Sequence, residues 1–452
     1  LIGLASGRFS LGQVAVPVGV VAAIVPTTNP TSTAIFKILA AIKGRNPVVL
    51  SPHPQAVKCT AETARIMYEA ARKAGAPEGC IGCVRNVTLQ GTTELMQNRK
   101  SRMILATGGP GLVKAAYSSG KPAFGVGPGN VPAFIERTAD VSKAVRDVVT
   151  GKTFDYGLLC SSEQAMVCDL PLEEEVLQEL EKNRAYLLDD EEQARLEKVV
   201  QLPQGGLNKA IVGKSSQVIA EMAGFAVPED VVCLVGKPRG VGREHPLSME
   251  KLSPILAFYV EDGWEAGCRR CIEILNFGGL GHTMSIHSRD EDIIMEFGLH
   301  KPAYRICVNT PATHGSIGLT TGVPPSMTLG CGTPGGNITS DNITPLHLIN
   351  IKRLAYEIRS VEDITFDRVE LPNPVEEEPG EVLEKADQTD PGTGLREIVR
   401  AVVEGYVREQ QTAPEAVLRE PAPPARPGPV SREKAAPRSA RDFVCEDDVR
   451  QA

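Results

Sequence analysis

The chain has 452 residues, enough for two or three domains with substantial cores. Its hydrophobic content of 42%, its 43 glycines and its single tryptophan are typical of a soluble α/β protein rather than a fibrous or disordered one. A net charge of -8 argues against nucleic acid as the main partner, and no apolar run approaches the roughly 20 residues of a membrane span. No signal peptide is visible, and the first residue is Leu1, so we expect the N-terminal segment to be missing.

Strand and helix patterns alternate in the first part of the chain. An apolar, β-branched run at 18–25 predicts a strand, and the turn at 26–30 leads into a helical pattern at 35–42. The same order recurs with a strand at 47–50 and a helix from about 55 to 74, and again with a strand at 103–106 and a helix up to Tyr117. This alternation predicts βαβ units and a parallel sheet.

The second part is expected to continue the alternation up to about Arg359. It includes a dense turn at 125–130 and one long charged helix at 172–196. Beyond it, residues 371–392 are acidic and rich in proline, which is typical of a solvated linker. Residues 393–410 regain a helical apolar stripe, residues 411–430 carry six prolines, and residues 442–450 form a last amphipathic segment.

Cys160 is the candidate nucleophile. It lies in a Gly-marked turn between a helical stretch and the apolar run 165–168, where a thiol can be held rigidly and still reach a cleft. The chain has 11 cysteines, and a buried cysteine is most often a small hydrophobic residue. The pairs at 80/83 and 268/271 have the spacing of zinc half-sites, but they are far apart in sequence, so we expect neither a metal nor a redox disulfide. Reduced thiols indicate a cytosolic setting.

Two polar turns follow the predicted strands of the first part. Thr107, Gly108 and Gly109 open a helix, where glycines admit close backbone approach and the helix N-terminus favours phosphate. A purely structural turn has the same sequence pattern, so this alternative stays open. Asn29 precedes a proline, which predicts a helix N-cap, and its amide is also placed to donate to a developing oxyanion.

Six motifs, in order, resemble the CoA-acylating branch of the aldehyde dehydrogenase superfamily. They occupy residues 24–33, 120–133, 154–164, 250–254, 278–283 and 329–333. The resemblance implies an α/β fold with a Rossmann-like cofactor domain, an α/β catalytic domain and a small oligomerisation hairpin near residues 13–16. The expected parts are an NAD(P)-binding domain at 1–124 with part of the hairpin, a catalytic thiol domain at 125–335, a return segment at 336–367 and a flexible tail at 368–452.

The resemblance assigns a role to several residues. Cys160 matches the catalytic cysteine, whose thiolate attacks the aldehyde before a hydride passes to NAD(P)+ and a thioacyl-enzyme remains. Asn29 is the candidate oxyanion partner, although the ungapped register places the family's Asn on Thr28. His282 matches a histidine near the active site that assists proton transfer or thioester contacts, with a structural histidine as the open alternative. Hydrolytic members carry a Glu where this chain has Gly125, so we expect acyl transfer to coenzyme A rather than to water.

The resemblance also implies cofactor and substrate contacts. Glu250 matches the position that holds the nicotinamide ribose, with a plain surface Glu as the alternative. The expected cofactor contacts, for NAD or NADP beside coenzyme A, are Thr27, Thr28, Ser51, His53, Thr107, Gly108, Gly109, Gly125, Val126, Glu250 and Leu252. The loop at 309–322 matches the lining of the aldehyde pocket and contributes Asn309, Thr310, His314 and Ile317. It contains no Lys or Arg, which favours propionaldehyde or acetaldehyde over the anionic sulfoacetaldehyde, the remaining alternative.

The tail resembles the encapsulation peptides by which enzymes are loaded into bacterial microcompartments. A plain disordered extension, or a helix for oligomer contacts, is the alternative. We expect a homodimer or tetramer, a shell protein as a further partner, no membrane contact, and a cytoplasmic location inside a microcompartment. A function of another class, a non-catalytic cargo or scaffold protein, also stays open, although the intact motif around Cys160 argues against it.

Overall fold

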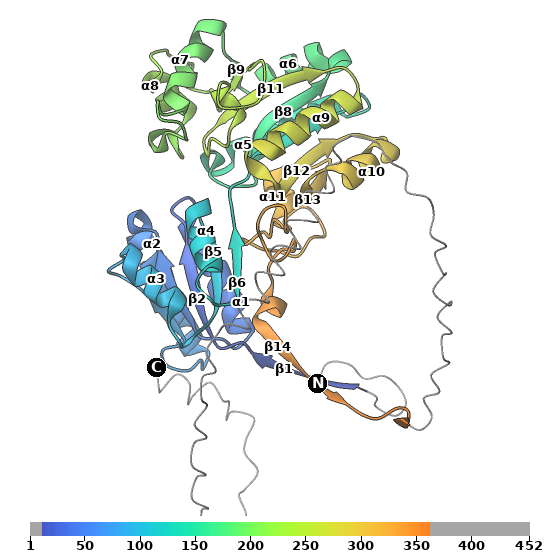
Figure 1. Cartoon of the computed structure of the whole chain (residues 1–452). Coiled ribbons are helices and arrows are strands. Elements are labelled where there is room, and N and C mark those ends of the chain that lie inside the picture. The colour runs from blue at the N-terminus through green and yellow to red at the C-terminus, as the bar shows by residue number, and fades with distance from the viewer. Residues whose placement is uncertain (1–10, 362–452) are drawn as a thin grey trace, which may run out of the picture. The chain divides into compact units, whose positions relative to one another are not determined.

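The structure is a computed structural model that describes residues 11–361 (Figure 1). Residues 11–356 lie in one compact unit. The predicted linker at 371–392, the apolar stripe at 393–410 and the final segment at 442–450 lie outside the described residues. None of the helices within residues 11–361 is both long and apolar enough to cross a membrane.

The first half of the chain builds a parallel sheet of five strands, which confirms the predicted βαβ alternation. Its strands are β2 (Val20–Val25), β3 (Val48–Pro52), β4 (Ile81–Cys83), β5 (Ser101–Thr107) and β6 (Ala123–Val126), and its helices are α1 (Pro30–Lys43), α2 (Val57–Lys73), α3 (Leu89–Gln97) and α4 (Pro110–Tyr117). The order across the sheet is β4-β3-β2-β5-β6. Val21 and Ala23 pack with α1 and α2, whereas Ala22 and Ile24 pack with α3 and α4, so both faces of the sheet are buried.

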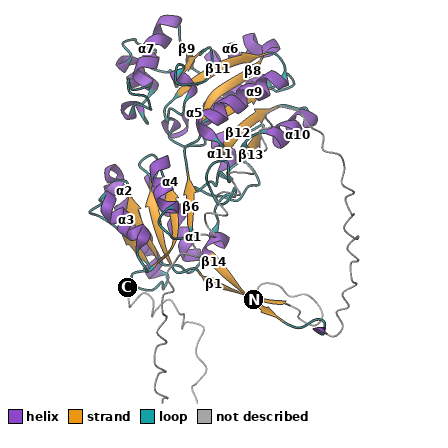
Figure 2. Ribbon diagram, in the orientation of Figure 1, coloured by secondary structure: helices purple, strands orange, loops and turns teal. Residues whose placement is uncertain are grey.

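The second half builds a parallel sheet of seven strands, flanked by helices like the first (Figure 2). Its strands are β7 (Val131–Ile135), β8 (Glu163–Asp169), β9 (Ala185–Leu187), β10 (Cys233–Gly236), β11 (Ile255–Glu261), β12 (Gly281–His287) and β13 (Ala303–Val308). Its helices are α5 (Val141–Thr153), α6 (Glu173–Lys182), α7 (Asp190–Val200), α8 (Ser216–Met222), α9 (Trp264–Ile274), α10 (Glu291–His300) and α11 (Ala312–Ser316). The order is β13-β12-β7-β8-β11-β10-β9. One face packs against α5 and α6 and the other against α7 to α10.

Residues 127–130 connect the two sheets. This segment leaves the carboxyl end of β6 and enters the amino end of β7. Because all seven strands of the second sheet are parallel, the turns that precede β8 and β12 lie at the same end of that sheet as the connection. The fold therefore brings the carboxyl edge of the first sheet and the amino edge of the second sheet to this segment.

A two-stranded antiparallel sheet contains the predicted hairpin region at 13–16. It is formed by β1 (Leu11–Pro17) and β14 (Ile349–Ala355), with Gln13 opposite Arg353 and Val16 opposite Asn350. The partner of β1 is therefore not a neighbouring strand but one more than 300 residues later in the sequence, within the predicted return segment.

The prediction of one long helix at 172–196 is wrong. The structure has α6, the edge strand β9 and then α7 in this region. Arg184 adopts a left-handed conformation (φ 60°) that ends the first helical segment, and Asp189 and Glu192 form a capping box that starts the second. The high charge of both helices concealed the three-residue strand between them.

The paired cysteines do not form metal sites in the described chain. Cys268 and Cys271 lie on α9 and point into the hydrophobic core, as their helical pattern predicted. Cys80 directly precedes β4 and Cys83 is its last residue, and both are free thiols. No group of three or more His, Cys, Asp or Glu side chains within residues 11–361 could hold a metal ion.

Two glycines test the packing of the second sheet. A Cβ on Gly267 of α9 would lie 2.3 Å from the ring of buried Phe134, which stacks on Phe297 with ring centroids 5.1 Å apart. We therefore expect Gly267→Ala to lower the free energy of unfolding by about 1–3 kcal/mol, because the ring has no room to move. The measurement is the midpoint of urea-induced unfolding.

Gly298→Ala is the matched control. Gly298 is exposed in α10, and a Cβ there meets no atom within 4 Å. Because alanine is the better helix former, this variant should unfold at a slightly higher urea concentration. Equal midpoints for the two variants would contradict the packing described for Phe134.

Candidate active site

Cys160 is presented by a tight turn between α5 and β8. Asp155, Tyr156 and Gly157 have consecutive left-handed φ angles of 48°, 52° and 72°. A Cβ on Gly157 would lie 2.8 Å from the Ser253 carbonyl oxygen, so the turn is pressed against a neighbouring segment. Gly157 adopts this conformation without strain, and the run of three left-handed residues fixes the direction in which the chain reaches Cys160. Cys160 as a whole residue is partly exposed.

His282 contacts the thiol. It lies at the start of β12 and is completely buried, and its Nε2 is 3.2 Å from Cys160 Sγ. Its Nδ1 is 3.0 Å from Thr283 Oγ1. Burial, and then the positive charge of Arg305, lower the pKa of His282 to about 3, so the imidazole is neutral near pH 7. The structure thus brings together two residues that the sequence analysis had each assigned to the active site.

Gly129 lies where the connecting segment crosses the thiol. A Cβ at this position would be 2.1 Å from the Cys160 carbonyl oxygen and 3.1 Å from His282 Cγ. The backbone N–H of Gly129 donates to Glu250 Oε1 at 3.0 Å. Gly129 was not singled out from the sequence, although its run Gly-Pro-Gly-Asn was recognised as a turn. It is the point at which Cys160, His282 and Glu250 meet.

Half-buried Glu250 and buried Lys251 are charged groups near the thiol. Burial raises the pKa of Glu250 to about 7, opposed by the hydrogen bond from Gly129. The next residue, buried Lys251, donates from Nζ to the carbonyl oxygens of Leu247 at 2.6 Å, Met249 at 2.8 Å and Gln164 at 3.1 Å. Lys251 therefore ties the segment that carries Glu250 to the strand that follows the thiol turn. Leu252, an expected cofactor contact, has a φ of 48° in the same segment, and its carbonyl accepts a hydrogen bond from Gly213.

The thiol of Cys160 is protonated at neutral pH. Burial, followed by the negative charges of Glu250 and Cys331, raises its pKa to about 12, while Arg305 acts in the opposite direction. Removal of the thiol proton therefore requires stabilisation of the thiolate when substrate is bound.

The expected cofactor residues of the first half lie at the carboxyl ends of neighbouring parallel strands. These are Thr27 and Thr28 after β2, Ser51 and His53 at the end of β3, Thr107 to Gly109 after β5, and Gly125 and Val126 in β6. This edge is where open α/β sheets bind nucleotides. The residues fit such a ligand: the buried hydroxyl of Thr107 has no partner within the described chain, and a Cβ on Gly109 would meet open space.

Ser51 and His53, two members of that set, have side-chain partners at the end of β3. Ser51 is buried, and its Oγ is hydrogen-bonded to Thr92 Oγ1 at 2.9 Å. His53 accepts a hydrogen bond from the Gln55 N–H through Nδ1 and caps a short helical turn. Both therefore shape the carboxyl edge of β3 in this structure.

Asn29 occupies the predicted N-cap position of α1, with Pro30 as the first helical residue. Its side chain, however, makes no capping hydrogen bond, and Oδ1 instead accepts from Thr28 Oγ1 at 3.0 Å. The expectation that the side-chain oxygen caps the helix is wrong, because the neighbouring hydroxyl competes for it.

Gly125 has no space for a side chain. A Cβ there would lie 2.7 Å from Val113 Cγ1 and 2.9 Å from Tyr117 Cε2, and the Gly125 N–H donates to Tyr117 Oη at 3.0 Å. The tyrosine ring of α4 thus occupies the position into which a carboxylate side chain would extend. A general base cannot be accommodated here without displacing that ring.

The loop at 309–322 divides between two ends of the second sheet. Asn309 is hydrogen-bonded to Ser288, directly after β12, whereas His282 stands near the start of that strand, roughly 20 Å away at ~3.3 Å per residue. Thr310 is hydrogen-bonded to Thr320 at 2.7 Å. His314 of α11 lies edge-on to Phe154, which begins the thiol turn, at a centroid distance of 4.9 Å.

Only the α11 part of the loop therefore reaches the thiol turn. The structure brings His314 to this turn but does not bring Asn309 there. Ile317 is half-buried directly after α11.

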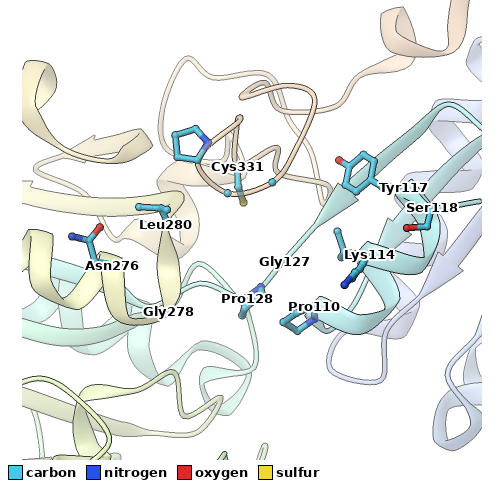
Figure 3. Close-up of a pocket in the computed structure, with 14 residues that line it drawn as sticks. Pro110, Lys114, Tyr117, Ser118, Gly127, Pro128, Asn276, Gly278, Leu280 and Cys331 are labelled. Atoms are coloured by element: carbon cyan, nitrogen blue, oxygen red, sulfur yellow. The ribbon is translucent and has the colours of Figure 1, made fainter. Parts of the chain in front are cut away.

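A pocket of about 570 Å³ adjoins the site. Figure 3 shows Cys331 and Leu280 on one side and residues of α4, including Lys114 and Tyr117, on the other. Gly127, which also lines the pocket, belongs to the segment that leads to Gly129. The pocket is thus a route by which a small molecule could approach the segment that crosses the thiol.

Comparisons with known proteins identify relatives of this chain. The sequence profile of the aldehyde dehydrogenase family matches residues 6–217. Aldehyde-alcohol dehydrogenase 2 of Entamoeba histolytica is 44% identical over 358 residues, which cover 77% of this chain but only 41% of that protein. The chain therefore spans about two fifths of the length of this relative. Succinate-semialdehyde dehydrogenase (acetylating) of Clostridium kluyveri is 40% identical over 80% of this chain and 79% of its own length.

Solved structures give the same relationship. An acetylating aldehyde dehydrogenase from Geobacillus thermoglucosidasius is 54% identical, with a TM-score of 0.77 over 78% of this chain and 77% of its own. The Clostridium phytofermentans propionaldehyde dehydrogenase of a fucose utilisation bacterial microcompartment is 29% identical, with a TM-score of 0.71 over 76% and 77% of the two chains. Rhodopseudomonas palustris propionaldehyde dehydrogenase, solved with bound propionyl-CoA, is 28% identical, with a TM-score of 0.71 over 76% and 75%. Because a dehydrogenase of this family is 40% identical over about four fifths of both chains, and the solved relatives share the fold, the chain belongs to the aldehyde dehydrogenase family.

Proposed function

We propose that this protein is a CoA-acylating aldehyde dehydrogenase that oxidises a short, neutral aldehyde to its acyl-CoA. The observation that carries the proposal is the contact between Cys160 and His282 combined with the filled space at Gly125. A thiol that can hold an acyl group is present, and the position of the hydrolytic base is closed by Tyr117.

The residues of the site divide the work. Cys160 Sγ forms a bond to the aldehyde carbon, and the resulting oxyanion is held by the backbone N–H of Cys160 with Asn29 as the proposed side-chain partner. A bound nicotinamide cofactor supplies the acceptor for the hydrogen and electron pair that the carbon loses. Glu250 would orient the ribose of that cofactor, which requires the carboxylate to leave its hydrogen bond with Gly129. A thioester on Cys160 remains.

Coenzyme A is the proposed acceptor of the acyl group. Its thiol is partly ionised near neutral pH, so it needs less help from a base than water does. Because a side chain does not fit at Gly125, no general base is available there. Its absence slows attack by water more than attack by a thiol. The acetylating relatives and the neighbouring structure with propionyl-CoA support this choice.

The proposed substrate is acetaldehyde or propionaldehyde. His314 and Phe154 border the thiol turn, and neither carries a fixed positive charge at neutral pH that would recognise an anionic aldehyde. Buried Arg305 donates to Ser340, His282 and Gly330 carbonyl oxygens and is not free to bind a sulfonate. Sulfoacetaldehyde stays the weaker alternative, with a relative of that activity at 38% identity.

The cofactor, the oligomeric state and the shell partner are proposed from the family resemblance, the sheet edges and the composition of the C-terminal residues. NAD is the expected cofactor, with NADP as the alternative. The sheet formed by β1 and β14 is the proposed element of a dimer or tetramer, because its outer edges are unpaired within the described chain. The composition of residues 393–450 supports docking to a microcompartment shell protein, in line with the neighbour from Clostridium phytofermentans.

The acceptor can be tested by following NADH in mixtures of enzyme, propionaldehyde and NAD with and without coenzyme A. We expect sustained NADH formation only with coenzyme A, and a single burst of about one NADH per Cys160 without it, because the thioester is then not discharged. Cys160→Ala should form no NADH, whereas Cys59→Ala, at an exposed thiol on α2, should behave like the wild type. Steady NADH formation without coenzyme A would disprove the proposed acceptor.

The close approach at Gly129 makes a second prediction. Gly129→Ala places a methyl group 2.1 Å from the Cys160 carbonyl oxygen and must displace the thiol turn. We expect kcat/KM for the aldehyde to fall on the order of a hundredfold, the effect of misplacing a reacting group by about 1 Å. Gly298→Ala should leave kcat/KM unchanged. An active Gly129→Ala enzyme would show that the crossing does not position the thiol.

The pH dependence of the free thiol provides a third prediction. Because burial and Glu250 raise the pKa of Cys160 to about 12, the reactive thiolate should increase about tenfold per pH unit between pH 7 and pH 10. The measurement is the rate of iodoacetamide labelling of the Cys160 peptide by mass spectrometry. A rate that levels off below pH 8 would mean that the thiol ionises far more easily than its surroundings imply.

A further inference from the structure

The neutral imidazole of His282 has one ring proton, and its position decides what the histidine can do for Cys160. With the proton on Nδ1, Nε2 would be free to accept the thiol proton. With the proton on Nε2, the ring would donate a hydrogen bond to Sγ. The neighbours of the Nδ1 atom distinguish these two states.

Thr283 is the neighbour that matters. Its side chain is completely buried, and its Oγ1 has two partners in the described chain: His282 Nδ1 at 3.0 Å and Arg305 Nε at 3.3 Å. The Nε–H of a guanidinium can only donate, so Thr283 accepts from Arg305. The hydroxyl hydrogen of Thr283 then has one acceptor within the described structure, which is His282 Nδ1.

The alternative arrangement leaves a proton unsatisfied. If Nδ1 carried the proton, Thr283 Oγ1 would accept from both neighbours, and its own buried hydrogen would have no acceptor among the described residues. Leaving a buried donor unpaired costs about 1–3 kcal/mol. That cost favours the state in which Thr283 donates to Nδ1.

Arg305 is held firmly enough to impose this direction. It is the register partner of Thr283 across β12 and β13 and is 5% exposed. Its Nη2 donates to the carbonyl oxygens of His282 and Gly330, both at 2.7 Å, and its Nη1 donates to Ser340 at 3.0 Å. These hydrogen bonds go to carbonyl and hydroxyl oxygens rather than to carboxylates, and the charge of Arg305 acts to lower the pKa of Cys160.

We propose that Arg305 and Thr283 are positioning residues that hold His282 with its proton on Nε2, so that the ring donates a hydrogen bond to Cys160 Sγ. This role rests on the proposed function. The hydrogen bond from His282 stabilises the Cys160 thiolate before it attacks the aldehyde and again when the acyl group leaves for its acceptor. His282 is then not the base that removes the thiol proton. The charge of Arg305, which favours the thiolate, and the low pKa of His282, which keeps the ring neutral, agree with the arrangement.

The tautomer can be observed directly. The full-length protein is labelled with ¹⁵N-histidine, and His282→Gln identifies the His282 signals among those of the seven histidines. At pH 7.5 we expect a protonated Nε2 and an unprotonated Nδ1 in long-range ¹H–¹⁵N spectra. A protonated Nδ1 in the wild-type protein overturns the proposal, whatever happens to the variants.

Thr283→Val removes the hydroxyl and keeps the shape of the side chain. We expect it to lose the Nε2–H state and to slow iodoacetamide labelling of Cys160 at pH 8 by about tenfold, which corresponds to one unit of thiol pKa. Thr283→Ser should restore both readouts. Unchanged tautomer and labelling in Thr283→Val would overturn the role of the hydroxyl.

Ser285→Ala is the matched control, since Ser285 is a buried hydroxyl on the same strand with no partner in the described chain. It should change neither the spectrum nor the labelling rate. Both measurements are made without aldehyde, nicotinamide or coenzyme A, so their outcome is independent of whether coenzyme A is the true acyl acceptor.

Discussion

The close passage of Gly129 over the thiol turn is the constraint on which the site depends. A backbone without a side chain lies against the Cys160 carbonyl and the His282 ring, and its N–H holds Glu250. The three groups come from segments more than 30 residues apart, and this contact brings them to one point. Gly129 belongs to the connection between the two sheets. The segment that joins the five-stranded sheet to the seven-stranded sheet therefore also assembles the site.

The electrostatic design of the site follows from burial. Buried Lys152 and Lys251 have lowered pKa values, and Glu163 and Glu250 have raised ones, each chiefly through desolvation. The lysines are satisfied by carbonyl and amide oxygens rather than by carboxylates. The resting thiol is consequently uncharged, and the groups that stabilise its thiolate act through fixed dipoles and one buried guanidinium. Such groups need no rearrangement when charge develops.

The sequence was sufficient for the parts of the site that depend on local pattern. The βαβ order, the turn around Cys160 and the placement of Thr107 to Gly109 after a strand follow from residue types at short spacing, whereas the special position of Gly125 was implied only by the family resemblance. The structure adds the reason why Gly125 carries no side chain: the ring of Tyr117 occupies the space that a side chain would need. The N-cap position of Asn29 was predicted correctly, but its side-chain capping bond is absent because the Thr28 hydroxyl donates to Oδ1, a contact that position alone does not reveal.

The features that were missed are tertiary. Gly129, Thr283 and Arg305 have no distinctive local pattern, and their roles depend on contacts across the sheet and between distant segments. The grouping of Asn309 with the aldehyde pocket overlooked that the loop starts at the opposite end of β12 from His282. The edge strand β9 was hidden because charged helices on both sides dominate the composition of that region.

The most direct test of the account is the fate of the acyl group on Cys160. The enzyme is mixed with propionaldehyde and NAD, quenched in acid and examined by peptide mass spectrometry, with a second sample chased by coenzyme A before quenching. The account predicts one acyl group on the Cys160 peptide that persists in water and disappears with coenzyme A as propionyl-CoA forms. An acyl group that is lost equally fast without coenzyme A, or none at all on Cys160, would contradict it.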